Sequence, residues 1–119
     1  MGVVTMIQAS GSHAYAHYKD ITESPWKLTH KYQYCAILKP EYRDVGKCAV
    51  HIARCIIANN KSGKFTYSQS DKRWNGWKNL NRWMKKYNCT IEEAIRDITD
   101  KDLQFDCSSF VLSCLWFAQ

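Results

Sequence analysis

The chain of 119 residues ends with the stretch FDCSSFVLSCLWFAQ, residues 105–119. Asp106 is a favourable N-cap residue, and the apolar residues after it predict a helix that begins at Cys107. A thiol attacks only as a thiolate, and a free thiol is mostly protonated at neutral pH. The unpaired N–H groups and the positive end of a helix stabilise such an anion and can also stabilise an oxyanion. The stretch therefore makes Cys107 a candidate nucleophile, with the N–H groups of Cys107 and Ser108 as oxyanion donors.

A structural role is the alternative, because Cys107 is one of six cysteines. No pair has C-x-x-C spacing, so the sequence predicts no zinc site, and we expect neither a metal nor a cofactor. Without an evident secretion signal, we expect reduced thiols rather than disulfides. Cys48, Cys55 and Cys114 fall among apolar helical residues, where a free thiol packs as a small hydrophobic group.

Two helices are predicted upstream. Asp44 is positioned to cap a helix over 44–60, whose apolar residues form one stripe: Val45, Cys48, Ala49, Ile52, Cys55 and Ile56. The Trp-rich segment after Trp74 has apolar residues three or four apart: Trp74, Trp77, Leu80, Trp83 and Met84. We interpret its tryptophans as core residues rather than a sugar-binding platform. The interleaved basic residues predict a solvated face: Lys72, Arg73, Lys78, Arg82, Lys85 and Lys86.

Two shorter signals complete the helical part. Thr90 and Glu93 have capping-box spacing, which predicts a third helix over 90–98. In the last helix, the residues expected in the core are Phe110, Val111, Cys114, Leu115 and Phe117.

The sequence pattern of the first forty residues predicts β-strands. The runs VVTMIQA (3–9), HAYAHYK (13–19) and KYQYCAIL (31–38) predict strands. SPWKLTH (24–30) could pair with 13–19 through a tight turn near Ile21-Thr22, which would set His13 opposite His30. We therefore expect one α+β domain over 1–119, with a β-rich part over 1–43 and a helical part over 44–119.

The net charge is +6, which favours an anionic partner such as nucleic acid, an acidic membrane face or an acidic cell-wall polymer. No nucleic-acid-binding module is recognisable. The opening MGVVTMIQAS has no basic start and too short an apolar run for a signal peptide, so we expect synthesis in the cytoplasm. No run approaches the ~18 apolar residues of a membrane span.

The segment Asp106–Val111, read as DCSSFV, resembles the nucleophile motif D-C-S-[GS]-[FL]-V of NlpC-type cell-wall cysteine peptidases, a papain-like family. KFTYSQSDKRWNGW (64–77) is similar to the segment that precedes this motif in phage endolysins of that group. The resemblance implies an α+β papain-like fold, with a small antiparallel sheet packed on helices and Cys107 at the start of the last one. It also implies that Tyr67 contacts the substrate or the oxyanion.

In most of that family the catalytic histidine follows the cysteine, but none follows Cys107 here. Either the chain is a fragment, or its elements are circularly permuted, as in the lecithin:retinol acyltransferase-like proteins. GSHAYAHY (11–18) resembles the strand that carries the histidine, which implies that His13 is the base, with His17 as its substitute. His30 or Gln33 would orient the imidazole. The fourth histidine, His51, lies on the polar side of its helix, and we expect it to be solvated surface.

The resemblance implies a cysteine endopeptidase or amidase that acts on bacterial peptidoglycan, similar to a bacteriophage lysis enzyme released by a separate membrane pore. One alternative is an acyltransferase or thioesterase that uses the same site on lipids, which the permuted order favours. Another is a non-enzymatic interaction protein, or half of a split enzyme whose partner supplies the histidine.

Overall fold

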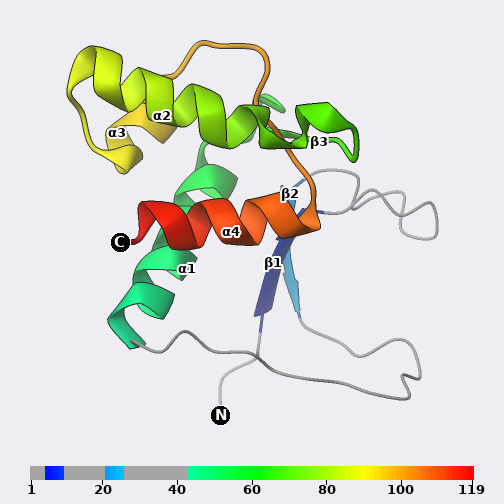
Figure 1. The fold of residues 1–119 in the computed structure, drawn as a ribbon. Coiled ribbons are helices and arrows are strands. Elements are labelled where there is room, and N and C mark those ends of the chain that lie inside the picture. Colours follow the sequence, from blue (N-terminus) through cyan, green and yellow to red (C-terminus); the bar gives the residue numbers. More distant parts are fainter. Residues whose placement is uncertain (1–4, 10–20, 26–42) are drawn as a thin grey trace.

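A computed structural model describes residues 5–9, 21–25 and 43–119 of the chain (Figure 1). The elements are β1 (Thr5–Ala9), β2 (Ile21–Pro25), α1 (Arg43–Ala58), β3 (Thr66–Tyr67), the 3-10 turn η2 (Asp71–Trp74), α2 (Asn75–Tyr87), α3 (Ile91–Asp97), β4 (Gln104–Phe105) and α4 (Cys107–Phe117). The described part is mostly helical and includes short paired strands. The predicted α+β class is therefore confirmed, whereas the papain-like architecture stays a prediction.

The described strands form two separate pairs. β1 and β2 run antiparallel, with Thr5 opposite Pro25 and Ala9 opposite Ile21. β3 and β4 run parallel, with Tyr67 opposite Phe105, and the Ser68 N–H donates to the Phe105 carbonyl at 3.0 Å. Since β4 leads directly into α4, this parallel pair brings Tyr67 to the start of the last helix.

The turn predicted at Ile21-Thr22 is wrong. Both residues lie inside β2, opposite Ala9 and Gln8, and their β-branched side chains suit a strand. The strand predicted over 3–9 is confirmed for Thr5–Ala9. The runs 13–19 and 31–38 lie outside the described residues, as do His13 and His30. The predicted pairing of 13–19 with 24–30, which would set His13 opposite His30, therefore lacks the turn that it requires.

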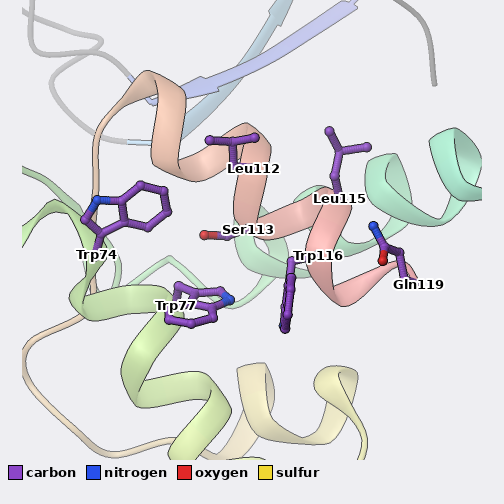
Figure 2. Close-up of a pocket in the computed structure, with 7 residues that line it drawn as sticks. All are labelled: Trp74, Trp77, Leu112, Ser113, Leu115, Trp116 and Gln119. Atoms are coloured by element: carbon purple, nitrogen blue, oxygen red, sulfur yellow. The ribbon is translucent and has the colours of Figure 1, made fainter.

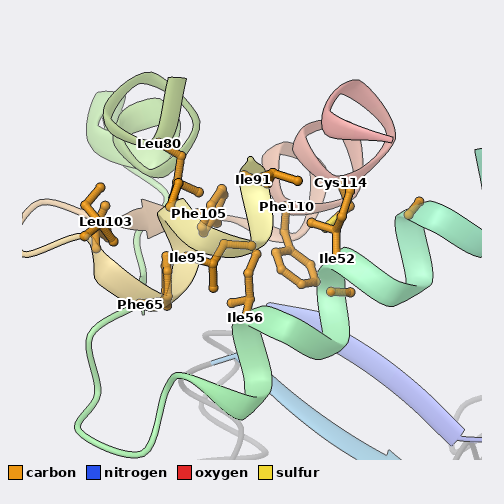
Figure 3. Packing of buried hydrophobic residues seen from close by; sticks show 14 residues of the cluster. Ile52, Ile56, Phe65, Leu80, Ile91, Ile95, Leu103, Phe105, Phe110 and Cys114 are labelled. Atoms are coloured by element: carbon orange, nitrogen blue, oxygen red, sulfur yellow. The ribbon is translucent and has the colours of Figure 1, made fainter. Parts of the chain in front are cut away.

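A single apolar cluster lies between the helices and β4 (Figure 3). α1 packs against α3 and α4, and α2 packs on α3 and β4. The fully buried Phe105 ring is the hub of the cluster, since it stacks on Phe65 at 6.3 Å and meets the edge of Phe110 at 5.6 Å. The buried members are Ala49, Ile52, Ala53, Ile56, Phe65, Leu80, Ile91, Ala94, Ile95, Ile98, Leu103, Phe105, Phe110 and Cys114.

The buried face of α1 differs from the predicted stripe. Ala49, Ile52 and Ile56 are buried as expected, but Ala53 joins them and Cys48 is exposed. The helix also begins at Arg43, so Asp44 lies in its first turn instead of capping it. The buried face is rotated by about one residue from the predicted stripe. The reason is that α1 packs on both α3 and α4, whereas a stripe predicted from apolar spacing assumes a single packing partner.

The remaining helices follow the sequence more closely. Thr90 and Glu93 form the predicted capping box of α3. The predicted basic face on η2 and α2 is exposed at every position. Leu80 is fully buried, and Trp77, Trp83 and Met84 pack against the core as half-buried residues. Trp74 was also predicted in the core, but it is half-buried and lies outside the cluster. Val111 on α4 was expected in the core but is exposed, because α4 is apolar around most of its circumference and its spacing does not define one inner face.

Candidate active site

The start of α4 is fixed by a reciprocal pair of hydrogen bonds. The Asp106 carboxylate accepts from the Ser109 backbone N–H at 2.7 Å, and the Ser109 hydroxyl accepts from the Asp106 N–H at 2.9 Å. This capping box confirms Asp106 as the N-cap and sets the position of Cys107, the first residue of the helix.

Ser109 also ties this helix start to the segment before α2. Its hydroxyl, fully buried, donates to the Arg73 carbonyl at 2.7 Å. The Arg73 side chain returns toward the cap, with Nε 3.9 Å from an Asp106 carboxylate oxygen. Sequence reasoning missed Ser109 and Arg73, because a capping box usually carries Glu or Gln at the position of Ser109.

The Cys107 thiol is exposed, and its sulfur lies 4.0 Å from the Ser108 hydroxyl, which is exposed as well. The N–H of Ser109 is used by the cap, and the N–H of Phe110 donates to the Asp106 carbonyl at 3.0 Å. The two N–H groups before them, those of Cys107 and Ser108, have no acceptor within an α-helix. A reacting carbonyl beside the sulfur could therefore reach both donors.

Tyr67 lies near this helix start, and the charged groups there affect the pKa of its phenol. Burial raises the pKa of the Tyr67 phenol, and the negative charges of Cys107 and Asp106 raise it further, although the Gln69 side chain opposes the shift. The phenol therefore stays protonated at neutral pH and keeps a hydrogen to donate. The structure thus places Cys107, Ser108, Asp106 and Tyr67 near the same helix start.

The other cysteines of the described residues do not share this setting. Cys114 is buried, as predicted, and burial raises its pKa to about 12. Cys55 is half-buried, and burial followed by the charge of Glu92 raises the pKa of its thiol. Cys48 and Cys107 are the exposed cysteines in this part of the chain, and none of its five cysteines is paired in a disulfide.

The candidate bases are placed differently. His13, His17, His30 and Gln33 lie outside the described residues. His51 is exposed on α1, as predicted, with Nε2 3.6 Å from both the Glu92 carboxylate and the Cys55 sulfur. β1, which ends four residues before His13, packs against α4, the helix that Cys107 begins (Figure 1).

Two negative findings apply to residues 5–9, 21–25 and 43–119. No group of three or more His, Cys, Asp and Glu side chains there could hold a metal ion. None of the helices described is long and apolar enough to cross a membrane. Comparison with protein families, with curated proteins and with solved structures finds no match to this chain.

Proposed function

We propose that the protein is a cysteine hydrolase that cleaves amide bonds in the stem peptides of bacterial peptidoglycan. The observation that carries the proposal is an exposed thiol at the first residue of a helix whose start is held by the Asp106–Ser109 box. The protonated Tyr67 beside it adds a hydrogen-bond donor. The DCSSFV motif, similar to that of NlpC-type peptidases, supports this reaction class, and the charge of +6 suits an anionic wall polymer.

In the first step, the Cys107 sulfur bonds to the scissile carbonyl carbon while His13 takes the thiol proton. The carbonyl oxygen becomes an oxyanion, which the N–H groups of Cys107 and Ser108 stabilise, with Tyr67 as a further donor. The C–N bond then breaks, and the imidazolium gives its proton to the leaving amine. Water hydrolyses the thioester, which releases the acid and returns a proton to the sulfur.

The role of His13 rests on chain order, since β1 packs on α4 and His13 follows β1 by four residues. His17 is the substitute base, and His30 or Gln33 would orient the ring. His51, the histidine of the described part, lies beside Glu92 and is not assigned as the base. If the protein is half of a split enzyme, a partner chain supplies the histidine instead.

The test is release of new amino groups from purified peptidoglycan. The wild-type protein should produce them, and Cys107→Ser should lower the rate at least about a thousandfold, since it removes the nucleophile. Cys48→Ser is the matched control, an exposed cysteine in the middle of α1, and should leave the rate unchanged. Equal rates for wild type and Cys107→Ser would refute the proposal.

Two further arms separate the alternatives. Cleavage of phospholipid esters, with no action on peptidoglycan, would establish the lipid acyltransferase or thioesterase instead. Loss of activity in His13→Ala, restored by added imidazole, would support His13 as the base. Activity that persists in His13→Ala and is lost in His17→Ala would transfer the role to His17.

A further inference from the structure

An open groove of about 560 Å³ lies between α2 and α4 (Figure 2). Its lining is almost entirely carbon and includes three indole rings. The lining residues are Trp74, Trp77, Leu112, Ser113, Leu115, Trp116 and Gln119. Of these, Leu112 and Trp116 are more than half exposed, at 53% and 56%.

The three indoles meet edge to face. Trp74 and Trp77 have ring centroids 6.5 Å apart, Trp77 and Trp116 are 5.8 Å apart, and both pairs are inclined at 80°. In an edge-to-face pair the edge of one ring contacts a single face of the other, and Trp116 is 56% exposed, so indole surface is left for a ligand. The groove thus offers flat aromatic surface of the kind that stacks on another ring.

Ser113 supplies the second observation. The residue is 1% exposed, and its hydroxyl oxygen is buried without a hydrogen-bond partner. Figure 2 shows that oxygen pointing from α4 into the groove, toward the tryptophans of η2 and α2. A buried hydroxyl without a hydrogen-bond partner destabilises the protein. A ligand that hydrogen-bonds to the hydroxyl would recover this energy.

The groove and the candidate nucleophile lie on the same helix. Leu112 and Trp116 follow Cys107 on the same helix, which places them about 7 to 14 Å along its axis. On the opposite wall, Trp74 follows Arg73, whose carbonyl is bonded to Ser109 in the first turn of α4. A polymer that lies in the groove would thus be bound along the helix that begins with Cys107.

We propose that this groove binds a pyranose ring of the glycan strand, and the inference rests on the proposed function. A pyranose has an apolar C–H face that can stack on indole and hydroxyls at its edge, one of which can pair with Ser113. Because the groove is open, the other hydroxyls stay in water and avoid the penalty of burial against carbon. A hydrocarbon chain would fill the groove but leave the Ser113 hydroxyl unpaired.

The test is titration of the full chain with a tetramer of N-acetylglucosamine, followed by tryptophan fluorescence and calorimetry. Trp116→Ala should weaken binding about tenfold because it removes one stacking face. Tyr87→Ala is the matched control, since Tyr87 is 52% exposed but stacks on Trp83 outside the groove, and should bind like wild type. No binding by wild type, equal weakening by both variants, or tighter binding of decanoate than of the sugar would overturn the proposal.

Ser113→Ala guards against an effect of misfolding. The variant should be at least as stable as wild type, because it removes an unpaired buried hydroxyl, yet bind the tetramer about fivefold more weakly. Unchanged affinity in this variant would also overturn the proposal. Sugar binding without peptidoglycan cleavage would refute only the proposed hydrolase function. Cleavage without sugar binding would refute only the proposal that the groove binds a pyranose.

Discussion

The Ser109 hydroxyl donates a hydrogen bond of 2.7 Å to the carbonyl of Arg73, 36 residues earlier in the chain. The same oxygen accepts from the Asp106 N–H at 2.9 Å, so one buried atom connects the N-cap of α4 with the segment that leads into α2. The position of Cys107 thus depends on Ser109, a buried residue two positions later in the chain.

Ser109→Ala should lower the free energy of unfolding by about 1–3 kcal/mol, since it leaves two half-buried backbone groups, the Asp106 N–H and the Arg73 carbonyl, without their partner. Chemical denaturation measures the change. Ser108→Ala, on the neighbouring exposed position, should stay within about 0.5 kcal/mol of wild type. If the two variants were equally stable, the hydrogen bond between Ser109 and the Arg73 carbonyl would not contribute to the free energy of unfolding.

Gly76→Ala should destabilise the protein, although alanine is favoured over glycine inside a helix by about 1 kcal/mol. A Cβ at Gly76 would lie within 2.8 Å of ring carbons of Phe105, which is held between Phe65 and Phe110 and cannot move aside. The expected net loss is about 1–3 kcal/mol by thermal or chemical unfolding. Lys78→Ala, exposed on the same helix, is the control, and a Gly76→Ala protein more stable than wild type would contradict the packing described.

Glu93 should make stability depend on acid. The Thr90 backbone N–H, followed by its side chain, holds the pKa of the Glu93 carboxyl below its usual value. A carboxyl with a depressed pKa in the folded state stabilises it above the unfolded value of about 4.3, and this stability is lost as the pH falls through the folded pKa. The free energy of unfolding, measured between about pH 6 and pH 3, should fall less steeply with decreasing pH in Glu93→Gln than in wild type.

Part of that slope should survive in Glu93→Gln, since the Arg96 side chain also holds the pKa of Asp97 low. The double variant Glu93→Gln/Asp97→Asn should therefore be flatter still. A slope identical in all three proteins would show that neither carboxyl contributes.

Cys114 should resist thiol reagents until the protein unfolds. Burial raises its pKa to about 12, so the thiolate that reacts is scarce near pH 8 and is enclosed by the core. Labelling with an aromatic disulfide followed by peptide mapping should modify Cys48 and Cys107 first and Cys114 only in denaturant. Rapid native modification of Cys114 would place it outside the core.

Signals confined to one helix end could be predicted from the sequence. The cap at Asp106 and the box of Thr90 with Glu93 are local, since each needs only residues three apart. The candidate Cys107 site was found for the same reason.

Features set by tertiary contact could not be predicted. The parallel pairing of Tyr67 with Phe105 involves strands of two residues each, too short to show a period. Cys48 and Val111 were placed inside because apolar spacing does not reveal how many neighbours a helix packs against. The hydrogen bond between the Ser109 hydroxyl and the Arg73 carbonyl joins residues 36 apart in the chain, so no local sequence pattern indicates it.

The acylation of Cys107 is the measurement that tests the account most directly. The protein would be mixed with an activated phenyl ester, quenched in acid and mapped by mass spectrometry, which reports the thioester on each cysteine as the phenolate leaves. We predict acylation at Cys107 at least about tenfold faster than at Cys48, which is also exposed, with the advantage reduced in His13→Ala. Equal rates at the two cysteines would contradict the claim that the start of α4 is an active site.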